Sequence, residues 1–521
     1  MSGVVENRSD RGDARSGSVL RSTARGAGWI LAWRGIKRLL GLINTLILAR
    51  LLLPADFGLV ALGAALAGAL GSLTAIGVEE ALIREARADA VMYDTGFTLN
   101  FLRAAVMALA LALIALPAAD FYHDPRLANV IYALSFCTFV TGLTNIGTVD
   151  FMRRLDFSRD FVLLSIPRLI SFVVTILVAA ATRSYYSLVF GMVANRVSAV
   201  IMSYTMHRYR PRISVKGWRS IARFSAWTWV NGIMLTVRDQ STTFLVGHAL
   251  GESSVGVYSV GIDLATMPTN EILSPFIRAG FPAFAAVRRD EGDVSGAFLR
   301  MLGLATFMTV PAAIGVSAIS DPLERLLLGP KWLTAIPIIQ VFGVLLILTA
   351  AGAVSEVMLS AHGRLARLFP IYALSAAARL LSLMALVPAF GLIGAVWAIG
   401  AVGALECLIW LATAARTLKV SFRRILPRVA RPLVAAGFMA AILYGIGLGW
   451  HTIQGSPLYL IISVSASVLV GAVCYFSVDF GIWAMIGRPL GAETDFLQVV
   501  DDIYGRWLQW QRLRFRFGEE E

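Results

Sequence analysis

Three basic side chains lie close together in an apolar stretch near the start of the chain. Residues 26–52 are long and apolar enough to cross a bilayer, but they include Arg34, Lys37 and Arg38. At 100° per residue these three side chains fall on one face of a helix. A cation at the centre of a bilayer costs about 2.5–3.5 kcal/mol even on lenient scales. We therefore expect this face to line a hydrated cavity or to bind an anion.

The other charged residues inside apolar segments differ between the two halves of the chain. In the first half they are basic, which suits a diphosphate, because Arg and Lys bind phosphate oxygens through charge-assisted hydrogen bonds. The candidate substrate contacts are Arg34, Lys37, Arg38, Arg103, Arg168 and Arg196. Snorkelling of the last three to a headgroup region is the alternative interpretation.

In the second half acids accompany the bases, which suits a coupling proton or sodium ion. The candidate ion-coupling residues are Asp239, Asp263 and Glu271. An interhelical ion pair is the alternative role for Asp239 and Asp263. Arg238 precedes Asp239, but neighbouring side chains on a helix point about 100° apart, so these two need not pair. One face of the next helix carries Asp263, Met267, Asn270, Ser274 and Arg278, with Glu271 at its edge.

The composition predicts an all-α polytopic membrane protein, since 57% of the 521 residues are hydrophobic and only 15% are charged. About fourteen segments have the length that a bilayer core demands. They are 26–52, 56–78, 95–117, 127–149, 161–182, 186–206, 221–247, 255–281, 298–319, 335–360, 368–388, 390–414, 431–449 and 457–477. Residues 1–25 are polar and basic without an apolar core, so we expect a disordered cytoplasmic arm rather than a signal peptide.

The loop charges predict the orientation. Basic residues gather in the linker 207–220 and in the loop after residue 414, whereas the opposite loops carry few. By the positive-inside rule both termini are cytoplasmic. The net charge of +13 then reflects topology and attraction to membrane lipid, and it gives little reason to expect nucleic-acid binding.

The sequence offers no motif for metal, cofactor or soluble-type enzyme chemistry. Cys137, Cys407 and Cys474 lie inside predicted spans without CxxC spacing, and the five histidines are scattered. There is no Walker loop, no glycine-rich dinucleotide turn and no nucleophile elbow. We expect neither an enzyme nor a cofactor, apart from a coupling proton or sodium ion.

An internal repeat divides the chain. LILARLLLPADFGLVALG at 46–63 aligns with FLVGHALGESSVGVYSVG at 244–261, and RLIS at 168–171 echoes RLLS at 379–382. Duplicated halves with a site between them are the usual build of a secondary transporter. The pattern predicts two pseudo-symmetric six-helix lobes, at 26–206 and 221–414, followed by two helices within 415–486 and a cytoplasmic tail at 487–521. Residues 494–517 of the tail show amphipathic helical spacing, which suits a helix on the inner leaflet or docking to a partner.

An ordered series of motifs resembles the Wzx-type polysaccharide exporters, in particular their colanic-acid-exporter-like branch. These belong to the multidrug/oligosaccharidyl-lipid/polysaccharide exporter superfamily. ILARLLLPADFG at 47–58 resembles their first-hairpin signature. Later matches are FYHDP at 121–125, MRRLDF at 152–157, residues 239–258, GFPA at 280–283 and LLGPKW at 327–332.

The resemblance implies a V-shaped flippase of the bacterial inner membrane, working by alternating access. Its substrate would be an undecaprenyl-diphosphate-linked oligosaccharide for exopolysaccharide, capsule or O-antigen synthesis, and a polymerase and export machinery would be partners. Arg34, Lys37 and Arg38 lie where such flippases line the cavity with cations, and Asp239 matches a recurring acid. The alternatives are a multidrug–cation antiporter, which wants an acidic or aromatic cavity, and an O-antigen polymerase or ligase, which places Arg and His in a large periplasmic loop.

Overall fold

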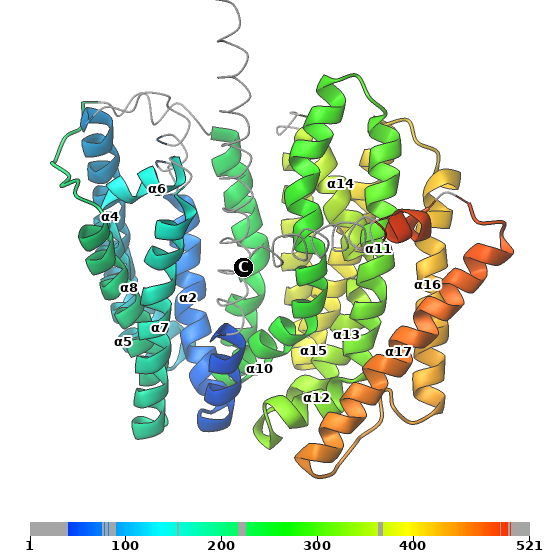
Figure 1. The fold of residues 1–521 in the computed structure, drawn as a ribbon. Coiled ribbons are helices and arrows are strands. Elements are labelled where there is room, and N and C mark those ends of the chain that lie inside the picture. The colour runs from blue at the N-terminus through cyan, green and yellow to red at the C-terminus, as the bar shows by residue number, and fades with distance from the viewer. Residues whose placement is uncertain are drawn as a thin grey trace, which may run out of the picture. The chain divides into compact units, whose positions relative to one another are not determined.

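The computed structural model describes residues 40–74, 78, 82, 90–153, 156–216, 226–362, 368–489, 491–498 and 501 (Figure 1). These residues form α-helices and short 3-10 turns, with no strand among them. The predicted all-α class is therefore confirmed. The backbone contacts divide the chain into two compact units, a first unit Met1–Gly256 and a second unit Val257–Glu521.

The first unit is built from antiparallel helix pairs. A short apolar helix, Leu40–Leu51, precedes the labelled elements. These are α2 (Pro54–Leu73), α4 (Ala90–Tyr122), α5 (Arg126–Gly142), η1 (Ile146–Thr148), α6 (Val149–Arg153), α7 (Phe157–Thr182), α8 (Tyr186–Met206) and the start of α10 (Ala226–Arg289). The pairs α4–α5 and α7–α8 make the most extensive contacts, and α5 also packs against α2 and α8.

The start of α2 shows how local sequence fixes a helix boundary and a close contact. Pro54 begins the helix, where its missing N–H is not needed, and the Leu53 N–H donates to Asp56 Oδ2 at 3.0 Å. One turn later Gly58 lies against the turn that contains Glu252. A Cβ at Gly58 would lie 1.7 Å from the Glu252 carbonyl oxygen, and one at Gly256 would lie 1.8 Å from the Pro54 carbonyl oxygen. The two glycines aligned by the repeat thus pack reciprocally within the first unit.

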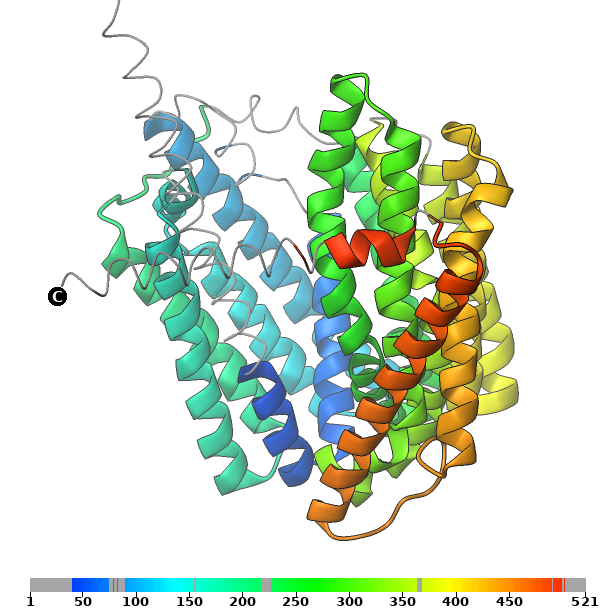
Figure 2. The ribbon, with the colours of Figure 1, turned by 45° about the vertical axis from the view of Figure 1, so that its right-hand side comes forward.

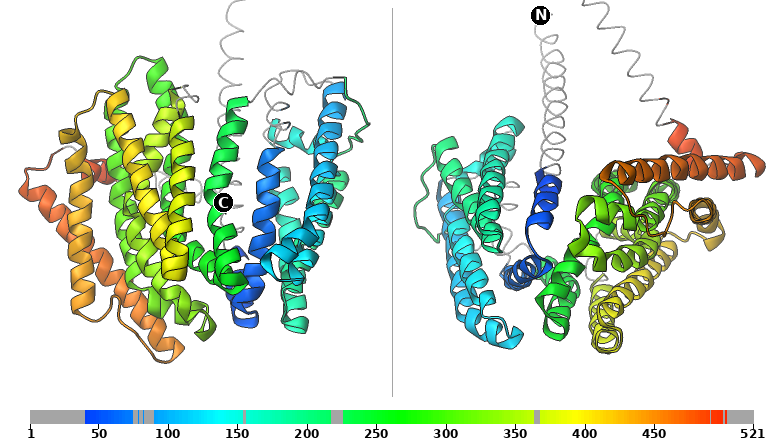
Figure 3. Two further views of the ribbon diagram at one scale, coloured as in Figure 1. Left: turned by 180° about the vertical axis from the view of Figure 1, so that it is seen from behind. Right: turned by 90° about the horizontal axis from the view of Figure 1, so that it is seen from below.

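The second unit begins with the rest of α10. It continues with α11 (Val294–Ala318), α12 (Ser320–Leu327), η2 (Pro330–Ala335), α13 (Ile336–Leu345), η3 (Leu346–Leu348), α14 (Thr349–Ala361), α15 (Phe369–Thr417), α16 (Phe422–Gly445) and α17 (Pro457–Met485). Helix α16 packs against both α11 and α17, which also contact each other (Figure 2). Helix α15 packs against α13 and α14 (Figure 3).

Two long helices contain a break at a glycine. Gly251 in α10 has φ 79° and Gly391 in α15 has φ 60°, and this left-handed region is readily adopted only by glycine. The break in α10 lies between the predicted spans 221–247 and 255–281, and the break in α15 lies at the start of the predicted span 390–414. Both breaks thus lie close to boundaries between predicted spans, although no break at a glycine was predicted.

The number of membrane spans is not confirmed at fourteen. Among the described residues nine helices are long and apolar enough to cross a membrane, or ten if Arg126–Gly142 and Ile146–Arg153, bent by 66°, form one span. The 49-residue α15 counts once although it covers two predicted spans, and the charged α10 is not among the nine. The boundary between the two units falls within α10, after Gly256. The six-helix lobes and their predicted boundaries stay a prediction.

Candidate functional site

The predicted basic stripe Arg34, Lys37 and Arg38 lies outside the described residues, so its role stays a prediction. The helix that follows, Leu40–Leu51, carries Asn44, which at 100° per residue falls on the same predicted face as these three residues. The Asn44 side-chain oxygen is buried and has no hydrogen-bond donor within the described part of the chain. The described end of this face thus keeps an unsatisfied polar group.

The other three candidate cations of the first unit lie on three different helices. Arg103 on α4 is half-buried, and its Nε is buried without a hydrogen-bond partner in the described part of the chain. Arg168 on α7 and Arg196 on α8 are exposed in the protein. No ion pair involves these three side chains among the described residues. A guanidinium without a protein acceptor retains the donors that a phosphate group requires.

Contacts with α5 place Arg103 and Arg196 at similar heights along the helices. Arg103 precedes Ala104, whose Cβ lies 2.4 Å from the Cβ that would be added at Gly142, at the end of α5. Arg196 lies close enough to Cys137, five residues earlier on α5, to act on it electrostatically.

The position of Arg168 follows from the pairing of α7 with α8. The Ser171 hydroxyl donates to the Gly191 carbonyl oxygen at 2.7 Å. Arg168 is one turn from Ser171, and Arg196 is about one turn from Gly191. The structure therefore brings the arginines to similar levels of the helix bundle, but it joins none of them to another.

The first part of the basic linker is hydrogen-bonded to α4. This contact was not predicted from the sequence. The Tyr209 hydroxyl donates to the Asp94 carboxylate, and the Arg212 N–H donates to Asp94 Oδ1 at 2.7 Å. Asn145, fully buried after α5, donates to the Tyr209 carbonyl oxygen at 2.7 Å. Burial and the hydrogen bond to Asp94 raise the pKa of Tyr209. The only sequence signal was an isolated asparagine where the apolar segment ends.

Arg238 and Asp239, whose pairing the helix geometry left open, form an ion pair in the structure. Arg238 Nε lies 2.8 Å from Asp239 Oδ1. The rule of 100° between neighbours describes the Cβ directions, whereas the long arginine side chain reaches around the helix. The Asp239 carboxylate is 52% exposed, so the pair leaves it accessible to solvent.

The other two predicted ion-coupling residues lie in the second unit, on α10. Asp263 is exposed, and no side chain of the described residues forms a hydrogen bond or ion pair with its carboxylate. Glu271 is exposed two turns further on. Arg278 donates from Nε to the Ser274 hydroxyl at 3.1 Å, as expected of residues on one face of a helix.

Two further acids of the second unit are held by neutral donors. Glu356 accepts a hydrogen bond from the Tyr372 hydroxyl at 2.5 Å. Glu406, only 8% exposed, accepts from the Ser375 hydroxyl at 2.6 Å and from Trp410 Nε1 at 3.3 Å. The sequence shows these acids but not their partners, apart from the i, i+4 spacing of Glu406 and Trp410.

Similarity to solved structures defines the class of fold. The lipid II flippase MurJ, in an inward closed conformation, matches with a TM-score of 0.68 at 11% identity, over 88% of this chain and 99% of that chain. A multidrug resistance MATE family transporter in an inward-facing conformation matches with a TM-score of 0.58 at 14% identity, over 73% of this chain and 94% of that chain. The fold is that of a polytopic helical transporter.

The chain belongs to the family described as "Polysaccharide biosynthesis protein", which matches residues 47–337. The succinoglycan biosynthesis transport protein ExoT of Rhizobium meliloti (strain 1021) is 26% identical over 61% of this chain, and the match spans 65% of that protein's length. The lipopolysaccharide biosynthesis protein WzxC of Escherichia coli (strain K12) is 24% identical over 67% of this chain and 71% of that protein. The teichuronic acid biosynthesis protein TuaB of Bacillus subtilis (strain 168) is 22% identical over 77% of this chain and 83% of that protein. The resemblance to Wzx-type exporters is confirmed.

Proposed function

We propose that this chain is a transporter rather than an enzyme, and that it flips undecaprenyl-diphosphate-linked oligosaccharide units across the bacterial inner membrane. Membership of the polysaccharide biosynthesis family carries this proposal. The relatives are named for succinoglycan, lipopolysaccharide and teichuronic acid biosynthesis, and one is named a transport protein. The flippase MurJ shares the fold.

The charge distribution supports a lipid-linked glycan as substrate. A sugar headgroup cannot cross hydrocarbon unaided, because its hydroxyl groups would lose their hydrogen bonds to water. Arg103 on α4, Arg168 on α7 and Arg196 on α8 have no acidic partner among the described residues, and they offer donors for a diphosphate. The prenyl tail can stay in lipid while the headgroup passes through a hydrated path beside these side chains.

Orientation, partners and coupling are parts of the same proposal. The basic linker and the basic loop after α15 favour a cytoplasmic location for both termini. A polysaccharide polymerase and export machinery would receive the flipped unit. A proton or sodium ion at Asp239, Asp263 or Glu271 would drive the cycle only if it binds the two conformations with different affinities. Transport by Asp239→Asn and Asp263→Asn that keeps its full dependence on the ion gradient would contradict this coupling.

The decisive experiment measures flipping directly. The purified protein is reconstituted in liposomes that contain a labelled undecaprenyl-diphosphate oligosaccharide, and leaflet accessibility is followed with and without an ion gradient. Arg34→Ala and Arg38→Ala are compared with the unaltered protein. We expect redistribution that is lost in both variants.

The other outcomes separate the function from the site. Redistribution that survives both substitutions keeps the flippase and removes the basic stripe as the diphosphate site. Absence of redistribution with several native glycans would instead favour the multidrug antiporter.

A further inference from the structure

A group of charged side chains is buried in the second unit where residues 491–498 fold back after α17. Asp479 on α17 is 0% exposed, Glu493 is 1% exposed and Arg431 on α16 is 7% exposed. Arg431 Nη1 lies 2.9 Å from Glu493 Oε1. Neither the family match, which ends at residue 337, nor the proposed transport site includes this group.

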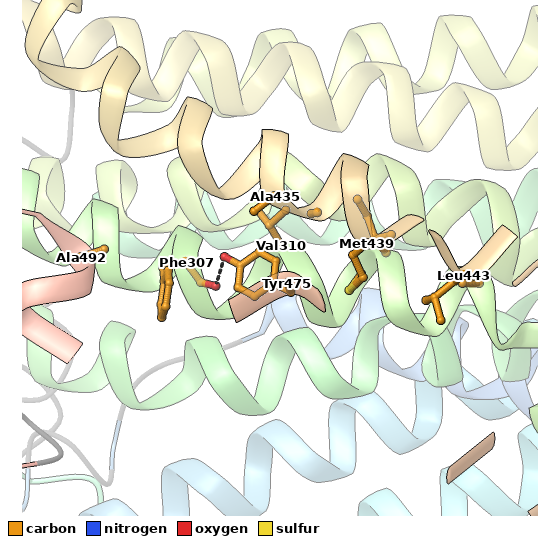
Figure 4. Close-up of a cluster of buried hydrophobic side chains, with 10 residues drawn as sticks. Phe307, Val310, Ala435, Met439, Leu443, Tyr475 and Ala492 are labelled. Atoms are coloured by element: carbon orange, nitrogen blue, oxygen red, sulfur yellow. Dashed lines mark hydrogen bonds between the residues drawn. The ribbon is translucent and has the colours of Figure 1, made fainter. Parts of the chain in front are cut away.

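An apolar cluster on α11, α16 and α17 positions the group (Figure 4). Tyr475 lies one helical turn before Asp479, is fully buried, and donates its hydroxyl hydrogen to the Phe307 carbonyl oxygen at 2.7 Å. Ala492 belongs to the same cluster, and Phe496 packs against it. The segment 491–498 is therefore held against the helices by apolar contacts on both sides of Glu493, which fixes its carboxyl group beside Asp479.

The two carboxyl groups lack a donor between them. Both oxygens of Asp479 and Oε2 of Glu493 are buried without a hydrogen-bond partner within the described part of the chain. Asp479 lies within hydrogen-bonding reach of Glu493. Ionised carboxylates are acceptors only, so two of them at this distance repel, whereas one proton turns one group into a donor for the other.

The surrounding charges do not compensate both carboxylates. Arg431 on α16 acts electrostatically on Asp479, and Arg428, also on α16, lies near enough to Glu493 to act on it. Arg428 is in turn close to Asp495 on the segment and to Arg300 on α11. Arg431 donates from Nε to the Pro427 carbonyl oxygen at 3.1 Å and pairs with Glu493 through Nη1. Arg428 donates from Nη1 to the Leu299 carbonyl oxygen at 3.2 Å. Asp479 thus has no cation in contact with it among the described residues, and an ionised buried carboxylate without a partner is strongly unfavourable.

We propose that Asp479 and Glu493 bind one proton between them and form, with Arg431, a proton-binding site in α16, α17 and the segment that follows. A metal ion is the less suitable occupant, because the described residues contain no group of three His, Cys, Asp or Glu side chains able to hold one. The site is separate from Asp239, Asp263 and Glu271, and it does not depend on the identity of the transported lipid.

The proposal gives the bound proton a structural effect. Asp479 belongs to α17, and Glu493 belongs to the segment packed on it, so the shared proton joins the two. Removal of the proton leaves two negative charges facing each other across this contact. The segment 491–498 then detaches more readily from α16 and α17 as the pH rises.

Infrared difference spectroscopy on the full-length protein in lipid nanodiscs tests the site. The band of the protonated carboxyl C=O should lose the intensity of one group per chain in Asp479→Asn, relative to the unaltered protein at neutral pH. Glu493→Gln should remove the same intensity, and it serves as the second variant if Asp479→Asn does not fold. Asp290→Asn is the matched control, because Asp290 is 69% exposed and pairs with the exposed Arg289.

A second measurement follows the contact itself. Limited proteolysis of the segment 491–498 should accelerate with rising pH in the unaltered protein and in the Asp290→Asn control, and it should be independent of pH in Asp479→Asn. An unchanged carboxyl band in both Asp479→Asn and Glu493→Gln would overturn the proposal. So would proteolysis of Asp479→Asn with the same pH dependence as the unaltered protein.

Discussion

Arg103 in the first unit and Glu406 in the second are both charged side chains within apolar helices, but their surroundings differ. The Arg103 Nε is buried and finds no acceptor among the described residues, whereas both oxygens of Glu406 accept hydrogen bonds, from Ser375 and Trp410. Arg168 and Arg196 resemble Arg103 in having no ion pair among the described residues. The first unit thus keeps cations available, and the second satisfies this buried acid internally.

The difference in pairing between Arg103 and Glu406 indicates which unit leaves charged groups for an external ligand. A buried polar group without a partner is costly, so a helix bundle that retains such groups is adapted to a hydrated path or to a bound ion of opposite charge. In the second unit neutral donors form hydrogen bonds with Glu356 and Glu406, whereas the exposed Asp263 on α10 has no side-chain partner among the described residues. We therefore expect substitutions of the first unit's arginines to affect transport, and substitution of Glu406 to affect stability.

The largest effect is expected from the double substitution Arg168→Gln and Arg196→Gln. If both guanidinium groups contact the diphosphate, the loss of two charge-assisted hydrogen bonds, each contributing about 1.5–3 kcal/mol, lowers transport by at least about a hundredfold. Both side chains are exposed in the protein, so the melting temperature should hardly change. Flipping in liposomes and thermal unfolding of the same preparations check the two statements.

A paired arginine in the same unit is the control for this double substitution. Arg159 pairs through Nε with Asp156 Oδ2 at 3.2 Å, and its side chain is 63% exposed. Arg159→Gln should leave flipping almost unchanged. If the double variant also transports normally, Arg168 and Arg196 do not bind the diphosphate and only snorkel towards lipid headgroups. The difference in charge pairing between the units would then have no role in transport.

A smaller effect, on stability, is expected for Glu406→Leu. The substitution leaves the Ser375 hydroxyl and the Trp410 N–H buried without an acceptor, which costs about 1–3 kcal/mol for each unsatisfied group. The melting temperature in detergent should fall, while Glu406→Gln, which keeps an acceptor oxygen, should recover most of it. Asp263→Asn is the matched control on an exposed acid and should melt like the unaltered protein. Equal melting temperatures for all three variants would show that Glu406 is not held as described.

The sequence predicted the helices better than the contacts between them. Apolar segments of bilayer length follow from local composition, and so the helices were within reach, whereas the breaks at Gly251 and Gly391 were not predicted. Asp479 and Glu493 are fourteen positions apart, and they meet only because the chain turns back after α17. The partners of Glu356 and Glu406 likewise depend on how α14 and α15 pack.

The candidate site was predictable in its charges but not in its pairing. The arginines stand out because cations are rare in apolar helices. Whether a cation has a partner depends on side-chain reach, and the Arg238–Asp239 pair shows that Cβ direction alone does not decide it for a long side chain. For the same reason the sequence pattern does not predict which arginine binds a phosphate.

Glu324 is a buried acid of the second unit whose carboxylate, unlike that of Glu406, accepts no hydrogen bond from the described residues. It is 0% exposed on α12, outside the apolar spans, and neither carboxylate oxygen has a hydrogen-bond partner within the described part of the chain. Burial, and secondly the charge of Asp321, raise the pKa of Glu324 to about 8. Asp321 itself is stabilised by Arg325 Nε at 2.9 Å and by the Ile453 N–H at 2.9 Å. Glu324 is therefore the group of α12 whose protonation changes near neutral pH.

The sign of the pH dependence follows from the raised pKa. An unfolded glutamate ionises near pH 4.3, so between about pH 4.3 and 8 the folded protein binds more protons at this position than the unfolded chain does. The free energy of unfolding should therefore decrease with rising pH across this window, by at most about 1.4 kcal/mol per pH unit from this residue. Thermal unfolding of Glu324→Gln between these pH values should lack that contribution, and the variant should be the more stable protein at pH 8. An identical pH profile for Glu324→Gln and the unaltered protein would mean that Glu324 finds a donor, and the second unit would then satisfy this acid as it satisfies Glu406.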